Sequence, residues 1–247
     1  MTEYDTLADV YEFLVPDALL EPDGAVAAFA AVRDALPPRA RVLDCACGTG
    51  QLAVGLALQG FTVTASDASS GMVARTRALA AHHGAAVAAE VRDWEELAGE
   101  FDAVLCVGNS LVHAAGRAAR RRALAAMARV LAPGGLLAVT SRNWARERAG
   151  GSRLDVAERM VRRGGRDGLV VRAWTMPDAC DAPHRLAVAV VLPAPDGTVT
   201  AAAETLTFWP FTPEELDADL RAAGLDVASS TYTRDAERYL VTARMRT

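Results

Sequence analysis

Three acidic residues, Asp44, Asp67 and Asp93, stand where short apolar segments of this 247-residue chain end. An ionised carboxylate accepts hydrogen bonds from hydroxyl and amino groups and attracts cations. The apolar segments are typical of buried strands, and in open α/β sheets ligands bind beyond the carboxyl ends of the strands. Acids at three successive strand ends therefore indicate a site for a nucleoside-like ligand.

The first of these acids opens a glycine-containing turn, DCACGTG at residues 44–50. Gly48 and Gly50 have no side chain, so a ligand can approach the backbone closely there. NAD-binding turns are similar but use a third glycine, which this chain lacks at the corresponding place. Asp44 would repel a pyrophosphate, whereas it would attract a cationic aminopropyl group. Both features favour S-adenosylmethionine over a dinucleotide.

The other two acids have matching candidate partners in such a ligand. Asp67 is expected to accept hydrogen bonds from the ribose hydroxyls. Asp93 is expected to accept one from the adenine amino group, with Trp94 packing nearby. A purely structural role, as a helix cap or a loop acid, stays open for Asp67 and Asp93.

A regular succession of strands and helices must hold these residues. The strands are expected at residues 41–45, 61–66, 86–91, 101–107 and 136–142. The helices are expected at residues 4–14, 25–36, 51–59, 69–82 and 118–131, with Ser69 as an N-cap. Strands that are apolar throughout and alternate with helices describe a parallel sheet covered on both faces.

The pattern changes after Trp144. Further strands are expected at residues 169–175, 185–192 and 198–208, with a hairpin turn at Pro195-Asp196-Gly197. The Arg-rich residues 146–166 predict a mobile or solvated connection before the inserted strands. Thr212 is expected to cap a helix with Pro213 at its first position, and a strand pair follows at residues 227–233 and 238–245.

Five segments together resemble the motif series of class I S-adenosylmethionine-dependent methyltransferases: VLDCACGTG, VTASDASSGMV, VRDW, FDAVLCVGNSLVH and LAPGGLLAVTSRNW. The likeness is greatest to the glycine N-methyltransferase and glycine/sarcosine methyltransferase family, and it runs from Arg41 to Trp144. It implies an α/β, Rossmann-like methyltransferase fold. Such a fold has a mostly parallel seven-stranded sheet, helices on both faces and an inserted antiparallel strand lid after the fifth strand.

The same resemblance implies a set of cofactor contacts. The implied residues are Asp44, Ala46, Gly48, Asp67, Met72, Asp93, Trp94 and Val107. We assign Tyr11, Gly50 and Ala68 to the same site. Three segments follow from this organisation: a cofactor-binding core with N-terminal helices (1–145), an inserted antiparallel lid (146–208), and a C-terminal helix and strand pair (209–247) that completes the sheet.

The acceptor side is expected at Asn109, His113 and Arg142. In the family that the chain resembles, the matching Asn contacts substrate and the matching Arg binds the substrate carboxylate, as a guanidinium fork does well. His113 could accept a proton from a hydroxyl acceptor. A structural role stays open for His113 and Arg142. A sulfonium methyl is already well activated, so orienting the acceptor would supply most of the catalysis.

The expected activity is N-methylation of a small amino-acid-like or amine metabolite. Beyond Tyr11 the family carries an arginine, whereas Val15-Pro16-Asp17-Ala18-Leu19-Leu20 contains no base, which argues against glycine itself. A small-molecule O-methyltransferase is the alternative. A non-catalytic nucleoside-binding partner protein and an NAD-dependent dehydrogenase are disfavoured by the intact acid–glycine turn and by the missing third glycine.

Bulk properties bear on partners and location. A net charge of −5 argues against nucleic acid as the substrate. No apolar run approaches the roughly 18 residues of a membrane span, and the N-terminus does not resemble a signal peptide, so we expect no membrane partner and a cytoplasmic location. Cys45, Cys47, Cys106 and Cys180 lack the spacing of a zinc site, so no metal is expected. A homo-oligomer stays open.

Overall fold

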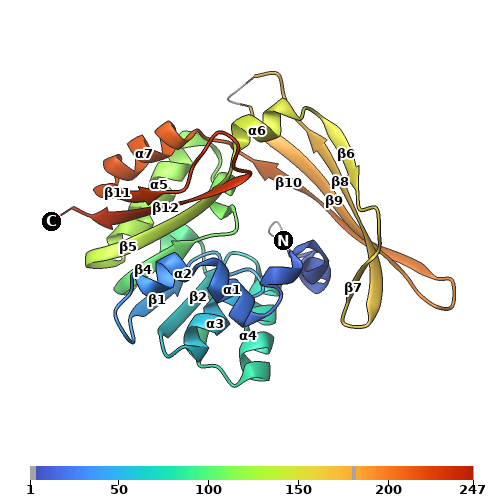
Figure 1. Ribbon diagram of the computed structural model, residues 1–247, viewed down its shortest axis with the longest axis horizontal. Coiled ribbons are helices and arrows are strands. Elements are labelled where there is room, and N and C mark those ends of the chain that lie inside the picture. Colours follow the sequence, from blue (N-terminus) through green and yellow to red (C-terminus); the bar gives the residue numbers. More distant parts are fainter. Residues whose placement is uncertain (1–3, 180–181, 247) are drawn as a thin grey trace.

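The computed structural model describes residues 4–179 and 182–246. A seven-stranded sheet forms the core, in the order β11-β12-β5-β4-β1-β2-β3 (Figure 1). Its strands are β1 (Arg41–Asp44), β2 (Thr62–Asp67), β3 (Val87–Val91), β4 (Phe101–Cys106), β5 (Leu131–Arg142), β11 (Leu225–Ser230) and β12 (Arg238–Met245). The first five run parallel, while β12 is antiparallel to both β5 and β11. The expected mostly parallel sheet is confirmed.

Helices cover both faces of this sheet. They are α1 (Pro22–Ala28), α2 (Ala30–Asp34), α3 (Gln51–Leu58), α4 (Ser70–His83), α5 (Gly116–Arg129) and α7 (Pro213–Ala222). Alternate residues of a strand point to opposite faces, and both sets are apolar here. Val104 belongs to the hydrophobic cluster that contains residues of α5 and α7, whereas Ala103 and Leu105 pack with α1 and α3. Burial on both faces explains why these strands are apolar throughout.

Side-chain caps define two of the helix starts as expected. Ser69 accepts a hydrogen bond from the Met72 amide at 3.2 Å. Thr212 accepts one from the Glu215 amide at 3.2 Å, and the Glu215 carboxylate accepts one from the Thr212 amide at 2.9 Å. This capping box satisfies backbone donors that the first turn of α7 would otherwise leave unpaired.

A buried carboxylate joins α5 to α7. Asp219 of α7 is fully buried and accepts hydrogen bonds from Arg117, Arg120 and Arg121 of α5 at 2.7–3.1 Å. Burial alone would raise the pKa of Asp219, but the bonds from the arginines outweigh it and lower the pKa. The two helices are therefore fixed to each other by a charge cluster as well as by apolar packing.

A second, antiparallel sheet is inserted between β5 and α7. Its strands are β6 (Arg153–Val156), β7 (Val161–Arg163), β8 (Arg166–Thr175), β9 (His184–Pro193) and β10 (Val199–Phe208), preceded by the helix α6 (Trp144–Ala149). The main path runs β10-β9-β8-β6, and β7 pairs with β8. We call these five strands the lid. The lid curves away from the core sheet (Figure 1).

The expectation that residues 146–166 form a mobile or solvated connection before the inserted strands was wrong. Residues of this segment form most of α6 and the strands β6 and β7, which pair with β8. Each of these strands has a partner that lies later in the sequence. Backbone pairing with β8 therefore orders a segment whose composition alone is typical of a solvated loop.

Residues 4–20 lie between the core and the lid (Figure 1). On the core side, the Ser69 hydroxyl donates a hydrogen bond to Asp5 at 2.6 Å. On the lid side, Arg163 donates to the Glu12 and Val15 carbonyl oxygens at 3.0 and 3.2 Å. This N-terminal segment therefore ties the lid to the core.

Two expected N-terminal helices differ in the structure. The first is a 3-10 helix, η1, which begins only at Ala8 and ends at Leu14, and Tyr4 before it has a φ of 76° that a right-handed helix does not allow. The second divides into α1 and α2 at Phe29, whose φ and ψ of −113° and 26° lie outside the helical range. Within the described residues, no helix is long and apolar enough to cross a bilayer.

Candidate functional site

A cavity of about 230 Å³ opens at the carboxyl ends of β1 to β4. The residues that line it are Tyr4, Cys45, Ala46, Asp67, Ala68, Arg92, Asp93, Trp94, Ser110 and His113. Parallel strands direct their carboxyl ends to one edge of the sheet, which brings residues from four separate loops together. The cavity unites predicted cofactor residues with the predicted acceptor residue His113.

Asp67 fixes the glycine turn from the neighbouring strand. Its two carboxylate oxygens accept hydrogen bonds from the amides of Gly48, at 3.0 Å, and Ser69, at 2.9 Å. Burial raises the pKa of Asp67, although both amides act against that shift. Gly50 has a φ of +92°, and a Cβ there would lie 2.8 Å from the Thr76 side chain. The turn therefore requires glycine at this position.

Asp44 is a buried carboxylate with one oxygen unsatisfied. The residue is 1% exposed, and its Oδ1 has no hydrogen-bond partner among the described residues. Burial raises the pKa of Asp44 from 3.8 to about 7, and the charge of Asp67 adds to that shift. An orphaned acid in such a place is stabilised by a cation, so the site fits a ligand with a positively charged group.

Trp94 and Asp93 form the wall at the end of β3. The Trp94 indole donates a hydrogen bond from Nε1 to the Cys45 carbonyl oxygen at 2.8 Å. Asp93 and Glu96 form a capping box on the short 3-10 helix η3 (Trp94–Glu96). The indole is thus locked against the glycine turn, and the Asp93 side chain also caps a helix.

Six predicted cofactor residues lie outside the cavity wall as the described residues define it. They are Tyr11, Asp44, Gly48, Gly50, Met72 and Val107. Met72 and Val107 are buried in the core, at 2% and 8% exposure. Burial raises the pKa of Tyr11; the charge of Asp67 adds to this effect and that of Arg238 opposes it. Tyr11 therefore lies within electrostatic reach of both Asp67 and Arg238.

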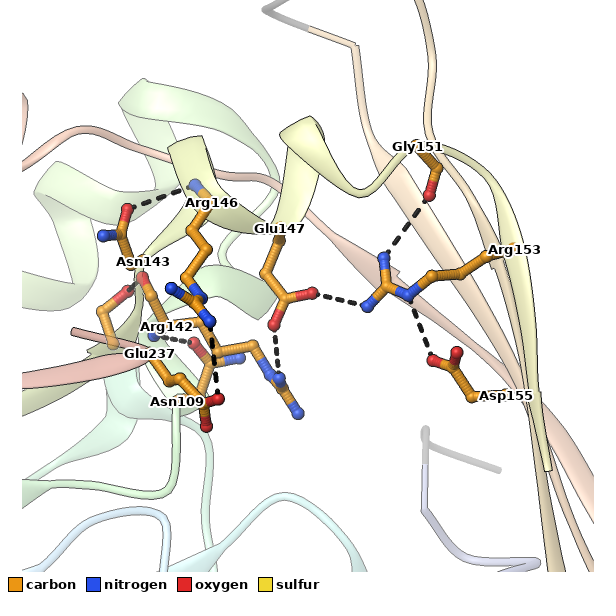
Figure 2. Close-up of polar contacts among 10 residues, drawn as sticks. Asn109, Arg142, Asn143, Arg146, Glu147, Gly151, Arg153, Asp155 and Glu237 are labelled. Carbon is orange, nitrogen blue, oxygen red and sulfur yellow. Dashed lines mark hydrogen bonds and ion pairs between the residues drawn. The ribbon is translucent and has the colours of Figure 1, made fainter. Parts of the chain in front are cut away.

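Asn109 and Arg142 are brought together at the ends of β4 and β5 (Figure 2). Asn109 has a left-handed backbone, with a φ of 70°, and its Oδ1 accepts a hydrogen bond from the Arg142 amide at 2.8 Å. The Arg142 guanidinium points away from that bond and donates from Nη1 to Glu147 Oε1 at 2.6 Å. Two predicted residues thus meet, but Asn109 contacts the backbone of Arg142.

Glu147 links an arginine of the core to an arginine of the lid (Figure 2). Its Oε2 accepts a hydrogen bond from Arg153 Nη2 at 2.9 Å, while its Oε1 accepts the one from Arg142. Burial would raise the pKa of Glu147, but Arg153 and Arg142 together lower it. Both guanidinium groups also lie over the Trp174 ring, at 5.4 Å for Arg142 and 5.2 Å for Arg153.

His113 faces the cavity and contacts Tyr4. The Tyr4 hydroxyl lies 3.0 Å from His113 Nε2, and the rings of His113 and Phe208 are 5.0 Å apart. Phe208 belongs to β10 of the lid. His113 therefore sits where the N-terminal segment, the core and the lid converge.

The aromatic side chains of Trp144, Trp174, Phe208, Trp209 and Tyr239 do not line one common pocket. Trp144, Trp209, Tyr232 and Tyr239 line a separate cavity of about 660 Å³ beside α5 and α7. Trp174 and Phe208 pack in the lid with ring centroids 5.8 Å apart and ring planes tilted by 33°. Most of the aromatic side chains are thus packing residues or belong to this second cavity.

The cysteines near the turn are buried thiols. Cys45, Cys47 and Cys106 are at most 8% exposed, and burial raises the pKa of both Cys45 and Cys47. Cys180 lies outside the described residues. Among the described residues, no three His, Cys, Asp or Glu side chains are grouped as a metal site requires.

Sequence reasoning missed several residues near the site. Glu147, Arg172 and Arg238 were not singled out. Arg238 is the cross-strand neighbour of Arg142, which only the antiparallel register of β12 reveals. One feature of the sequence could have pointed to Glu147, which is the single acid in the Arg-rich segment WARERAGGSR.

Sequence comparison identifies the central part of the chain. Residues 42–135 match a family described as "Methyltransferase domain". A glycine/sarcosine N-methyltransferase of Parasynechococcus marenigrum is 39% identical over 115 residues. That match covers 45% of this chain and 41% of the relative, so the chain aligns with less than half of the relative's length.

Structural comparison extends over nearly the whole chain. An amino pentose methyltransferase of Micromonospora echinaspora, solved with S-adenosylmethionine bound, has a TM-score of 0.76 and 26% identity, covering 100% of this chain and 98% of its own. The sugar N-methyltransferase KedS8 of Streptoalloteichus has a TM-score of 0.71 and 26% identity, covering 88% and 85%. The chain therefore has the Rossmann-like fold of the S-adenosylmethionine-dependent methyltransferases, and its residues 42–135 match a methyltransferase domain.

Proposed function

We propose that the chain binds S-adenosylmethionine in the 230 Å³ cavity and transfers its methyl group to the nitrogen of a small amine that carries an anionic group. The observation that carries this proposal is the unsatisfied, buried carboxylate of Asp44 beside the glycine turn. When bound, S-adenosylmethionine supplies a sulfonium methyl that needs no further activation.

The residues of the chain would hold the cofactor by its polar groups. Asp44 would lie toward the positively charged end, Asp67 would accept hydrogen bonds from the ribose and Asp93 would accept one from the adenine. Ala46 and Gly48 leave the backbone of the turn accessible to the ligand. The Trp94 indole, held by the Cys45 carbonyl oxygen, provides a fixed wall.

On the acceptor side, the chain would orient the amine. Arg142 projects toward the lid from the end of β5, and Tyr11 lies within electrostatic reach of both Asp67 and Arg238. An anionic group held near Arg142 would direct the rest of the acceptor toward the cofactor cavity. The lid and the N-terminal segment would exclude water from the space between. The names of three relatives, a glycine/sarcosine N-methyltransferase, an amino pentose methyltransferase and a sugar N-methyltransferase, support an amine acceptor.

Titration calorimetry with S-adenosylhomocysteine and NAD tests the cofactor part. We expect a micromolar dissociation constant for S-adenosylhomocysteine and no signal for NAD. A micromolar NAD signal without one for the sulfonium-derived ligand would refute the proposal. The acceptor part is tested by the release of S-adenosylhomocysteine with a panel of small amines and matched alcohols.

O-methylation is the second candidate, and the position of His113 favours it. A hydroxyl acceptor must lose a proton, and His113 faces the cavity with Nε2 next to the Tyr4 hydroxyl. O-methylation replaces N-methylation as the proposed reaction under two conditions. The alcohols of the panel must turn over while the amines do not, and His113→Gln must remove the acidic limb of the pH profile. Tight binding without any turnover would instead indicate a non-catalytic binding protein.

A further inference from the structure

Two arginine side chains lie beside the acceptor region without a partner. Arg238 and Arg142 are directly opposite in the β5–β12 pair, so their side chains project to the same side of the sheet. Arg172 belongs to β8 of the lid, on the same strand face as Trp174, and the Arg142 guanidinium lies over the Trp174 ring. Within the described residues, the side chain of neither Arg172 nor Arg238 forms a hydrogen bond or an ion pair.

The neighbouring acids are already engaged. Glu147 is shared by Arg142 and Arg153, and Asp155, which is opposite Arg172 in the β6–β8 pair, accepts a hydrogen bond from Arg153 at 3.1 Å. Glu237 forms a 3.8 Å ion pair with Arg146.

The region between core and lid therefore has more cations than anions. Among the residues named, five guanidinium groups, those of Arg142, Arg146, Arg153, Arg172 and Arg238, lie with three carboxylates, Glu147, Asp155 and Glu237, which leaves an excess of two positive charges.

This arrangement is unfavourable without a ligand. Like charges directly opposite each other in a sheet destabilise it. Burial lowers the pKa of Arg172 and of Arg238, and the charge of Arg142 lowers both further. Asp155 opposes the shift at Arg172, and Tyr11, Glu147 and Glu237 oppose the shift at Arg238, which is exposed to solvent. Repulsion of this kind is retained at binding sites, because selection for binding can favour residues that lower the stability of the fold.

We propose that Arg142, Arg172 and Arg238 bind a doubly charged phosphoryl group on the acceptor, which joins the lid to the core. A phosphate ester carries close to two negative charges at neutral pH and offers three acceptor oxygens, which suits guanidinium donors from two sides. A single carboxylate would neutralise only one of the two unpaired cations. This inference rests on the proposed function, because it names the anionic part of the acceptor.

The test measures binding of inorganic phosphate, acetate and malonate to the full chain saturated with S-adenosylhomocysteine, at constant ionic strength. We expect phosphate to bind more tightly than acetate or malonate. Arg172→Gln and Arg238→Gln should each weaken phosphate binding about ten- to a hundredfold, as expected for lost hydrogen bonds to a charged group. Arg185→Gln, which removes an exposed charge on the outer face of β9, is the matched control and should change it less than about threefold.

A stability measurement separates binding from a structural role. Without phosphate, Arg238→Gln should melt at or above the wild-type temperature, because one repelling charge is gone. The stabilisation that phosphate gives to the wild type should be lost in the same variant. A lower melting temperature without phosphate would mark Arg238 as a structural residue and overturn the proposal.

The matched ligands O-phosphoethanolamine and ethanolamine test whether the phosphoryl group belongs to an amine acceptor. O-phosphoethanolamine should compete with phosphate and ethanolamine should not. Equal weakening by the Arg185 control, malonate binding tighter than phosphate, or no competition by O-phosphoethanolamine would overturn the inference. If S-adenosylhomocysteine still binds in those cases, the methyltransferase proposal stands. If S-adenosylhomocysteine does not bind, it is the proposed function that fails.

Discussion

Asn109 Oδ1 accepts a hydrogen bond from the backbone amide of Arg142 at 2.8 Å. The backbone amide of Asn109 donates one to Thr140 Oγ1 at 3.3 Å. The loop after β4 is thereby fixed to the end of β5. The Asn109 oxygen is engaged with the backbone, so we assign this residue to positioning Arg142 rather than to contacting the acceptor.

Asn109→Ala should lower the free energy of unfolding by about 1–3 kcal/mol, because a part-buried amide loses its partner. The left-handed backbone at residue 109 adds strain for alanine. The Michaelis constant for the acceptor should rise while cofactor affinity changes little. Asn109→Asp keeps an acceptor oxygen and tolerates the left-handed region, so it serves as the control. Equal stability of the two variants in urea would contradict this role.

Asp44 should make the cofactor-free protein less stable as the pH rises. The pKa of Asp44 is about 7 in the fold against an ordinary 3.8, so the folded state binds more protons between these values. Stability contributed by this group is therefore lost as the pH increases from about 4 to 7. The melting temperature of the wild type should fall relative to that of Asp44→Asn across this window.

The same shift predicts proton release when the cofactor binds. A cation placed beside Asp44 favours its ionised form and lowers its pKa. Calorimetry near pH 7 in buffers of different ionisation enthalpy should detect the released proton in the wild type and none in Asp44→Asn. Identical proton release by both proteins would show that Asp44 does not face the positive charge.

Asp67→Ala should weaken binding of S-adenosylhomocysteine about ten- to a hundredfold, since hydrogen bonds to a charged group are worth roughly 1.5–3 kcal/mol. The structure adds a second reason, because the Gly48 amide loses its acceptor and the glycine turn is released. Calorimetric titration gives the dissociation constant, and circular dichroism checks the fold. An unchanged constant in a folded variant would leave Asp67 only as a cap.

Arg142→Ala should keep cofactor affinity within about threefold, because the guanidinium points to the lid and Arg142 is not among the residues that line the 230 Å³ cavity. Acceptor affinity should fall by roughly 2–5 kcal/mol, as when one member of a buried charge pair is removed. Arg142→Lys should restore only part of it, since the bidentate fork is lost. Wild-type kinetics in the alanine variant would make Arg142 structural and favour an uncharged acceptor.

Asp219→Asn should lower the free energy of unfolding by about 3–5 kcal/mol, because three arginines of α5 lose the buried anion that they share. Asp217 on the same helix forms an exposed ion pair with Arg221. Asp217→Asn is therefore the control and should cost less than about 1 kcal/mol. Similar urea midpoints for the two variants would contradict the cluster's role.

The parts of the fold that local sequence determines could be predicted. Buried strands such as Phe101–Cys106 are apolar on both faces, and the caps at Ser69 and Thr212 follow from short-range chemistry. The segment 146–166 could not, because β6 and β7 form only by pairing with the later strand β8. The position of Arg238 beside Arg142 could not be predicted either, because it depends on the antiparallel register between two distant segments.

The place of the lid in the chain has a consequence for how specificity could change during evolution. The lid leaves the core after α6 and returns before α7, so its residues are contiguous in the sequence. Under the proposed function, the glycine turn would hold a cofactor that stays the same, whereas the inner face of β8 would contact whichever acceptor is used. Substitutions there could exchange one acceptor for another without disturbing the cofactor. Transplanting residues 153–208 from a relative should therefore transfer its acceptor preference along with the segment.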